Sequence, residues 1–176
     1  MRRNMYVDEN KERGYLIMGA VIDSAHVPHV RRTLRSLLLP GQERLHMTAE
    51  RDSRRLQIIE SVLSLGVLGI AAEALGPRNE RVQRSACLGS ILSRTAELEV
   101  GSVCIERDDA AQVRDRRLLR SFAEELPVGW RLSYSWLPAR SEPALWTADA
   151  LVWAYARGGK WRSLVAGSVA VEVVDV

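Results

Sequence analysis

The sequence from residue 4 to residue 23 reads NMYVDENKERGYLIMGAVID and predicts the first two strands of a sheet. Residues 4–9 have the composition of a short strand that ends on two acids, Asp8 and Glu9. Residues 14–23 are almost wholly apolar and rich in branched side chains, which is typical of a strand buried on both faces. Because only a short polar turn separates the two segments, we expect them to pair as an antiparallel hairpin.

Beyond this hairpin, amphipathic helical patterns alternate with short apolar runs. We expect helices over residues 24–39, 50–64, 79–97, 110–126 and 142–157. We expect an extended piece over residues 45–48 and further strands over residues 67–75, 101–106 and 130–137. Residues 164–176 carry a β-rich tail, and its β-branched part, residues 169–176, is expected either to join the same sheet, which we favour, or to build a homodimer interface. This order of elements predicts an α/β fold, a single domain over residues 1–176 with a mixed sheet and helices on both faces.

The composition is that of a soluble globular domain. The 176 residues are 47% apolar and 27% charged, close to the averages for such proteins, and they suffice for one well-formed core. No apolar run reaches the roughly 18 residues that a membrane span needs. Cys87 and Cys104 form neither a disulfide framework nor a zinc motif. We therefore expect a cytoplasmic protein that does not associate with a membrane.

The charge pattern permits nucleic-acid binding without requiring it. The net charge is +3, and only two of the 25 basic residues are lysines, Lys11 and Lys160. Arginine is the better bidentate ligand for phosphate, but an excess of arginine is also what a GC-rich genome produces, and we favour the genomic explanation. The arginines of the expected helices, Arg81 and Arg84 among them, are interpreted as parts of solvated helix faces.

The helix expected around residues 145–156 is apolar nearly all round and carries a single charge, Asp149. A helix of this kind is buried, and a buried carboxylate costs several kcal/mol unless it is paired or bound to a metal. Asp149 is therefore either a catalytic or metal-binding carboxylate, or a structural one that pairs with an arginine or faces water at the helix edge. Glu142, seven residues earlier, lies on nearly the same helical stripe and could point to the same place.

Asp8 is the second acid in an unusual position. It ends the first strand, beside a strand that is expected to be buried on both faces, and such strand ends are where α/β proteins usually bind ligands. Glu9 faces the opposite side of the strand, so only one of the two acids can point into a given site. The alternative is a solvated turn, in which neither acid has a special role.

Three short segments resemble an RNase H-like protein family of unknown function. YVDEN (residues 6–10) followed by GYLIMGAVI (residues 14–22) is similar to the family's opening hairpin, which typically carries Asp-Glu-Ser, although Asn10 stands here in place of the serine. LHMTA (residues 45–49) resembles its histidine-containing segment, and WTADAL (residues 146–151) its late acidic helix. The resemblance spans nearly the whole chain and implies an RNase H-like fold and a metal-dependent nuclease.

A nuclease of this type uses three or four carboxylates that converge on two Mg²⁺ or Mn²⁺ ions. In RNase H-like folds these acids come from the first strand, the fourth strand and a late helix. The resemblance thus implies that Asp8, Glu106 and Asp149 are the metal ligands and catalytic acids. Asp108 and Asp109 are alternatives to Glu106, and Glu50 or Glu73 could supply a fourth carboxylate. An incomplete set would leave a binding protein rather than an enzyme.

His46 is the remaining candidate for the catalytic site. It could deprotonate the attacking water or bind a metal, or it could be a structural histidine of a loop. His26 and His29 are interpreted as solvated. Two functions therefore stay open: a divalent-metal-dependent nuclease or phosphodiesterase that acts on nucleic acid, and a non-catalytic RNase H-like module that binds nucleic acid or a protein partner.

Overall fold

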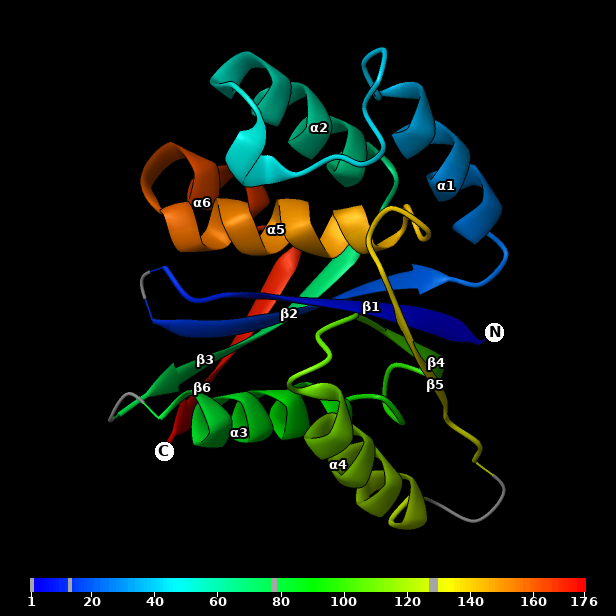
Figure 1. Ribbon diagram of the computed structural model, residues 1–176, viewed down its shortest axis with the longest axis vertical. Helices are drawn as coiled ribbons and strands as arrows, with labels where there is room; N and C mark the ends of the chain where they lie inside the picture. The colour runs from blue at the N-terminus through cyan, green and yellow to red at the C-terminus, as the bar shows by residue number, and fades with distance from the viewer. Residues whose placement is uncertain (1, 13, 77–78, 127–129) are drawn as a thin grey trace.

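The computed structural model describes residues 2–12, 14–76, 79–126 and 130–176. Within these ranges six strands form one mixed sheet in the order β5-β4-β1-β2-β3-β6 (Figure 1). The strands are β1 (Arg3–Asn10), β2 (Tyr15–Asp23), β3 (Leu68–Leu75), β4 (Val100–Glu106), β5 (Ser133–Leu137) and β6 (Val169–Asp175). β1 pairs antiparallel with β2 and β2 with β3, whereas β4 is parallel to β1, β5 to β4 and β6 to β3.

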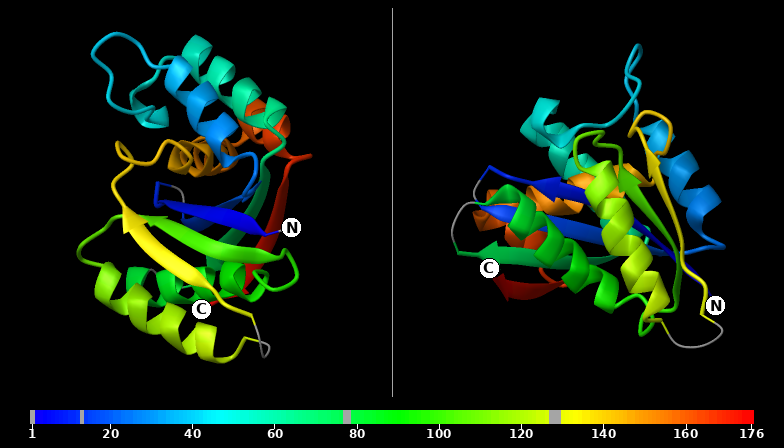
Figure 2. Two further views of the ribbon diagram at one scale, coloured as in Figure 1. Left: turned by 90° about the vertical axis from the view of Figure 1, so that its right-hand side faces the viewer. Right: turned by 60° about the horizontal axis from the view of Figure 1, so that its bottom comes forward.

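Helices cover both faces of this sheet (Figures 1 and 2). They are α1 (Val27–Ser36), the 3-10 helix η1 (Met47–Ala49), α2 (Asp52–Ser64), α3 (Glu80–Ser93), α4 (Gln112–Glu124), α5 (Leu145–Arg157) and α6 (Gly159–Val165). α1, α2, α5 and α6 lie on one face and α3 and α4 on the other. The α/β prediction is confirmed, and the arrangement is consistent with an RNase H-like sheet.

β2 is the centre of the core, as its apolar composition predicts. Every residue of β2 except its last is buried. Met18 and Ala20 contribute to the core under α5, while Ile17 and Val21 contribute to the core over α3. Because the side chains of a strand alternate between the two faces, this one strand joins the two helical layers.

α5 is the most deeply buried of the described helices. Nine of its 13 residues are buried, and it packs across β1 and β2. Burial against the sheet accounts for its apolar character. No helix in the described parts of the chain is both long and apolar enough to cross a membrane.

Two expectations on secondary structure need correction. Residues 45–48 do not form an extended piece throughout, because Met47 begins η1, a turn whose carbonyl oxygens bind the guanidinium of Arg55. The tail is not continuous β-structure either, since α6 occupies residues 159–165 before β6 begins. Gly158, with φ of 75°, ends α5 and lets the chain turn directly into α6. β6 joins the protein's own sheet beside β3, the first of the two alternatives for the tail.

Candidate functional site

Asp149 lies in the middle of α5, on the side of the helix that meets η1. Its carboxylate is 17% exposed, and its Oδ2 accepts a hydrogen bond of 3.0 Å from the backbone N–H of Met47. The Nδ1 atom of His46 lies 3.6 Å from the same oxygen. Among the described residues no arginine forms an ion pair with Asp149. The alternative in which Asp149 pairs with an arginine is therefore not met, and the carboxylate is held by a backbone donor and a histidine.

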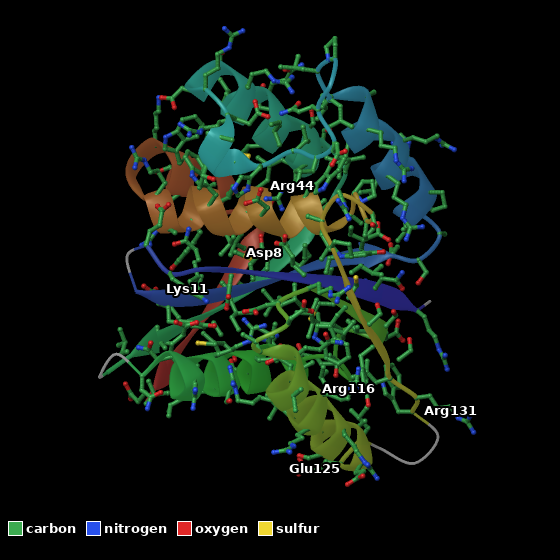
Figure 3. The ribbon with its side chains drawn as sticks, in the orientation of Figure 1. Asp8, Lys11, Arg44, Arg116, Glu125 and Arg131 are labelled. Carbon is green, nitrogen blue, oxygen red and sulfur yellow. The ribbon has the colours of Figure 1, made fainter. Side chains whose placement is uncertain are left out.

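Asp8 and Glu106 face α5 from neighbouring parallel strands. The register pairs Tyr6 with Cys104 and Val7 with Ile105, so Asp8 and Glu106 follow in line near the carboxyl ends of β1 and β4. Tyr6 and Cys104 belong to the core under α5, and strand alternation places the two acids on that same face. Figure 3 labels Asp8 in the space between β1 and α5.

The three acids are close enough to influence one another. The pKa of Asp8 is raised well above its usual value, first by burial, then by the negative charge of Asp149 and then by that of Glu106. Contact with the Glu106 carboxyl raises this pKa further, while the N–H of Glu9, which donates to Asp8 Oδ1 at 2.7 Å, lowers it. Two negative neighbours therefore oppose the ionisation of Asp8, which is the electrostatic signature of converging carboxylates.

The segment between α1 and α2 brings two basic side chains to this cluster. Arg44 donates from Nη1 to Glu106 Oε1 at 3.1 Å. The pKa of His46 is raised, chiefly by its interaction with Asp149, while the charge of Arg44 acts in the opposite direction. The second ring nitrogen of His46, Nε2, lies 2.7 Å from Thr48 Oγ1. His46 is thus placed between an acid of the cluster and an exposed hydroxyl.

The donor set suits a hard divalent cation, although the carboxylates are not yet arranged as its ligands. Asp8, Glu106 and Asp149 supply only oxygen donors, which Mg²⁺ and Mn²⁺ prefer. A cavity of about 110 Å³ at the ends of β1 and β4 reaches Asp8 and Glu106, but Arg84 and Ile17 line it from the α3 side of the sheet and Asp149 does not line it. In the part of the chain that is described, no three His, Cys, Asp or Glu side chains already form a coordination site. Each acid instead contacts protein groups: the Glu9 N–H for Asp8, Arg44 for Glu106, and the Met47 N–H together with His46 for Asp149.

Several acids that the sequence suggests lie elsewhere. Glu142 is 5% exposed and binds both Arg31 and the N–H of Ala144, so it does not point to the place that Asp149 faces. The reason is that α5 begins at Leu145, and Glu142 therefore precedes the helical stripe.

The remaining alternatives are also separate from the cluster. Glu50 accepts from Gln42 and lies 3.5 Å from Arg54, and Glu73 lines a different pocket of about 270 Å³ near the end of α5. Asp108 accepts from the N–H of Ala110, and Asp109 pairs with Arg107 at the surface. His26 and His29 are exposed, as expected.

The structure contains a buried ionic network on the opposite face of the sheet that we did not predict from the sequence. Arg84, only 7% exposed, donates to both oxygens of Asp115 at 3.0 and 2.7 Å and also binds Glu9. Tyr15 donates its hydroxyl to the same Glu9 oxygen. The interpretation of Arg84 as solvated is wrong. Its spacing from Leu88, Ile91 and Leu92 on the buried side of α3 is the signal that could have indicated burial.

Comparisons with known proteins do not assign the chain to a family. No protein-family model matches the chain, and a search of curated proteins finds no match either. The resemblance to an RNase H-like family therefore rests on the short sequence segments, and the functional assignment rests on the site itself.

The pH dependence of stability should reveal the crowding of the acids. Because the pKa of Asp8 is raised above 3.8 only in the folded protein, the folded state binds this proton more tightly than the unfolded chain. The resulting stabilisation is complete below about pH 4 and is lost as the pH rises through the raised pKa. We expect Asp8→Asn to gain stability relative to wild type over that interval, as measured by urea unfolding at successive pH values. Parallel pH curves for the two proteins would show that Asp8 is not perturbed.

Proposed function

We propose that the protein is a divalent-metal-dependent nuclease or phosphodiesterase of RNase H-like type that acts on nucleic acid. One observation carries the proposal: carboxylates from β1, β4 and α5 face one space beside the sheet, and two of them perturb the third. This space lies at the carboxyl ends of parallel strands, where α/β proteins commonly bind ligands. The segments that resemble the RNase H-like family supply two of these acids, Asp8 and Asp149.

Asp8, Glu106 and Asp149 would hold Mg²⁺ or Mn²⁺. Bound divalent cations polarise phosphoryl oxygens and lower the pKa of water, which is the chemistry that phosphodiester hydrolysis needs. The acids come from three separate elements, and β1 and β4 are fixed side by side by their backbone register. The protein thereby keeps like charges near one another, an arrangement that costs stability and is typical of functional sites.

His46 is placed to handle a proton at the edge of the cluster. The Asp149 carboxylate beside Nδ1 favours the tautomer with hydrogen on that nitrogen, which leaves Nε2 as the acceptor. Nε2 lies beside the exposed Thr48 hydroxyl, and a water molecule can replace that hydroxyl. We therefore assign His46 as the residue that accepts a proton from water, with Asp149 as the group that orients it.

Nucleic acid is the substrate class that fits the charge of the chain. The net charge is +3 despite 22 acidic residues, and arginine supplies nearly all of the positive charge. Guanidinium groups match phosphate oxygens bidentately. Nucleic acid is a polyanion whose backbone consists of phosphodiester bonds, and these are the bonds that a divalent cation held by the acid cluster would help to hydrolyse.

A non-catalytic module is the second candidate, and one observation favours it. Each acid of the cluster already has a protein partner, so the set can persist without a cation. A module of this kind would bind nucleic acid or a protein without hydrolysing it, and it would keep the acids only as parts of a hydrogen-bonded framework.

Cleavage of labelled single- and double-stranded oligonucleotides in Mn²⁺ separates the two candidates. We expect wild type to cleave, and Asp8→Asn to lose at least about 100-fold in rate, since even residues that only orient metal ligands contribute 10–100-fold. Asp175→Asn is the matched control, because Asp175 is an exposed aspartate on the edge strand β6. Equal rates for the three proteins would reveal a contaminating nuclease, and intact oligonucleotides with wild type would favour the binding module.

A further inference from the structure

Arg44 differs from the other arginines near the acid cluster in how loosely it is held. Arg55 donates to Met47 O, Thr48 O and Asp52, and Arg31 binds the buried carboxylate of Glu142 with two nitrogens. Arg44 has one hydrogen bond, from Nη1 to Glu106, and its side chain is 40% exposed. With the described residues, the other four N–H groups of this guanidinium form no hydrogen bond.

The position of Arg44 in the chain allows its side chain to move while the backbone around it stays in place. It lies in the irregular segment between α1 and η1, next to Leu45, which is 2% exposed. Leu45 and Met47 anchor this segment in the core under α5, so the backbone is fixed while the guanidinium reaches outward. Figure 3 labels Arg44 and Asp8 on the same side of the sheet.

Glu106 links this arginine to the proposed cation site. The Arg44–Glu106 pair is partly exposed on both sides, 40% and 30%, and exposed pairs contribute little to stability. A divalent cation that binds Glu106 would compete with Arg44 for the carboxylate, and its charge would then repel the guanidinium. The guanidinium would be free to pair with an anion beside the cation, and a substrate phosphate is that anion.

We propose that Arg44 is a substrate-binding residue that changes partners: it neutralises Glu106 in the cation-free protein and contacts a phosphate of the nucleic acid once a cation occupies the cluster. This inference rests on the proposed function. It adds an order of events: the cation binds first and frees Arg44 from Glu106, and Arg44 then contacts the substrate phosphate. It makes Arg44 a competitor of the cation, and the phosphate contact distinguishes this role from that of an arginine that only pairs with Glu106.

Mn²⁺ binding to the protein without nucleic acid, followed by electron paramagnetic resonance, tests the competition. We expect Arg44→Met to bind Mn²⁺ about twofold to fivefold more tightly than wild type, the range that loss of one weak ion pair allows. Arg44→Lys, which keeps the charge, should bind Mn²⁺ nearly as wild type does. Arg32→Met is the control, because Arg32 is an exposed arginine of α1 and the net charge changes equally.

Oligonucleotide binding in Ca²⁺, which occupies oxygen sites, tests the second partner. Arg44→Met should bind more weakly than Arg32→Met, and its salt dependence should fall by about one phosphate contact. Arg44→Lys should lie between them, because it lacks the planar fork. The proposal for Arg44 alone would be overturned by either of two results. The first is Mn²⁺ binding by Arg44→Met that is unchanged or weaker than that of wild type. The second is an oligonucleotide affinity of Arg44→Met equal to that of Arg32→Met. Failure of wild type to bind Mn²⁺ would overturn the proposed function as well.

Discussion

Arg84→Met is expected to lower the free energy of unfolding by about 3–5 kcal/mol, one of the largest effects of any single substitution in this chain. Asp115 is only 3% exposed, and both of its oxygens bind the Arg84 guanidinium. Without that guanidinium, Asp115 is left as an uncompensated buried charge, and Glu9 loses one of its partners. Urea unfolding at neutral pH measures the loss directly.

Arg81→Met provides the control for this substitution. Arg81 is exposed on the same helix, α3, and its replacement changes the net charge equally. Surface substitutions of this kind are usually within about 0.5 kcal/mol of neutral. A loss of stability in Arg84→Met no larger than that of the control would mean that the network under β1 does not form as described.

Asp149→Asn is expected to keep or increase the stability of the cation-free protein while abolishing its response to cations. Asparagine is nearly isosteric, and its Oδ1 can still accept the hydrogen bond from the Met47 N–H. It removes a negative charge that acts on Asp8, so a gain of about 1 kcal/mol is expected despite the lost attraction to His46. Denaturant unfolding of wild type and variant, with and without Mn²⁺, provides the measurement.

The opposite result would assign Asp149 a structural role. If the carboxylate serves mainly to hold His46 and η1 in place, its loss should cost about 3 kcal/mol, as for other broken buried pairs. The protein would then respond to Mn²⁺ in the same way as wild type does. Asp175→Asn, an exposed aspartate far along the chain on β6, controls for the change of net charge.

Local patterns were sufficient to predict the hairpin and the buried helix. The apolar run of residues 15–22 predicts that β2 is buried on both faces, and the short polar turn before it predicts the antiparallel pairing of β2 with β1. Asp149 was identifiable because a lone charge in an apolar helix needs a compensating partner. Asp8 and Glu106 were identifiable as strand ends, since strand periodicity also determines the face to which each side chain points.

Long-range pairings were not predictable from the same patterns. The helical spacing of α3 places Arg84 on its buried side, but no local periodicity identifies its partners, Asp115 from α4 and Glu9 from β1. Glu142 was misplaced because the start of α5 was set three residues early, which put it on the wrong stripe. The donor of the Asp149 hydrogen bond, the Met47 backbone, belongs to a segment 102 residues away.

Thermal unfolding in the presence and absence of millimolar Mn²⁺ tests the central claim, that the acids of β1, β4 and α5 form a cation site. We expect the melting temperature of wild type to rise, because a cation at 100 times its dissociation constant stabilises the folded state by about 2.7 kcal/mol. Asp8→Asn should show no rise, and Asp175→Asn should rise as wild type does. A wild-type melting temperature that Mn²⁺ leaves unchanged, or an equal rise in Asp8→Asn, would contradict the claim.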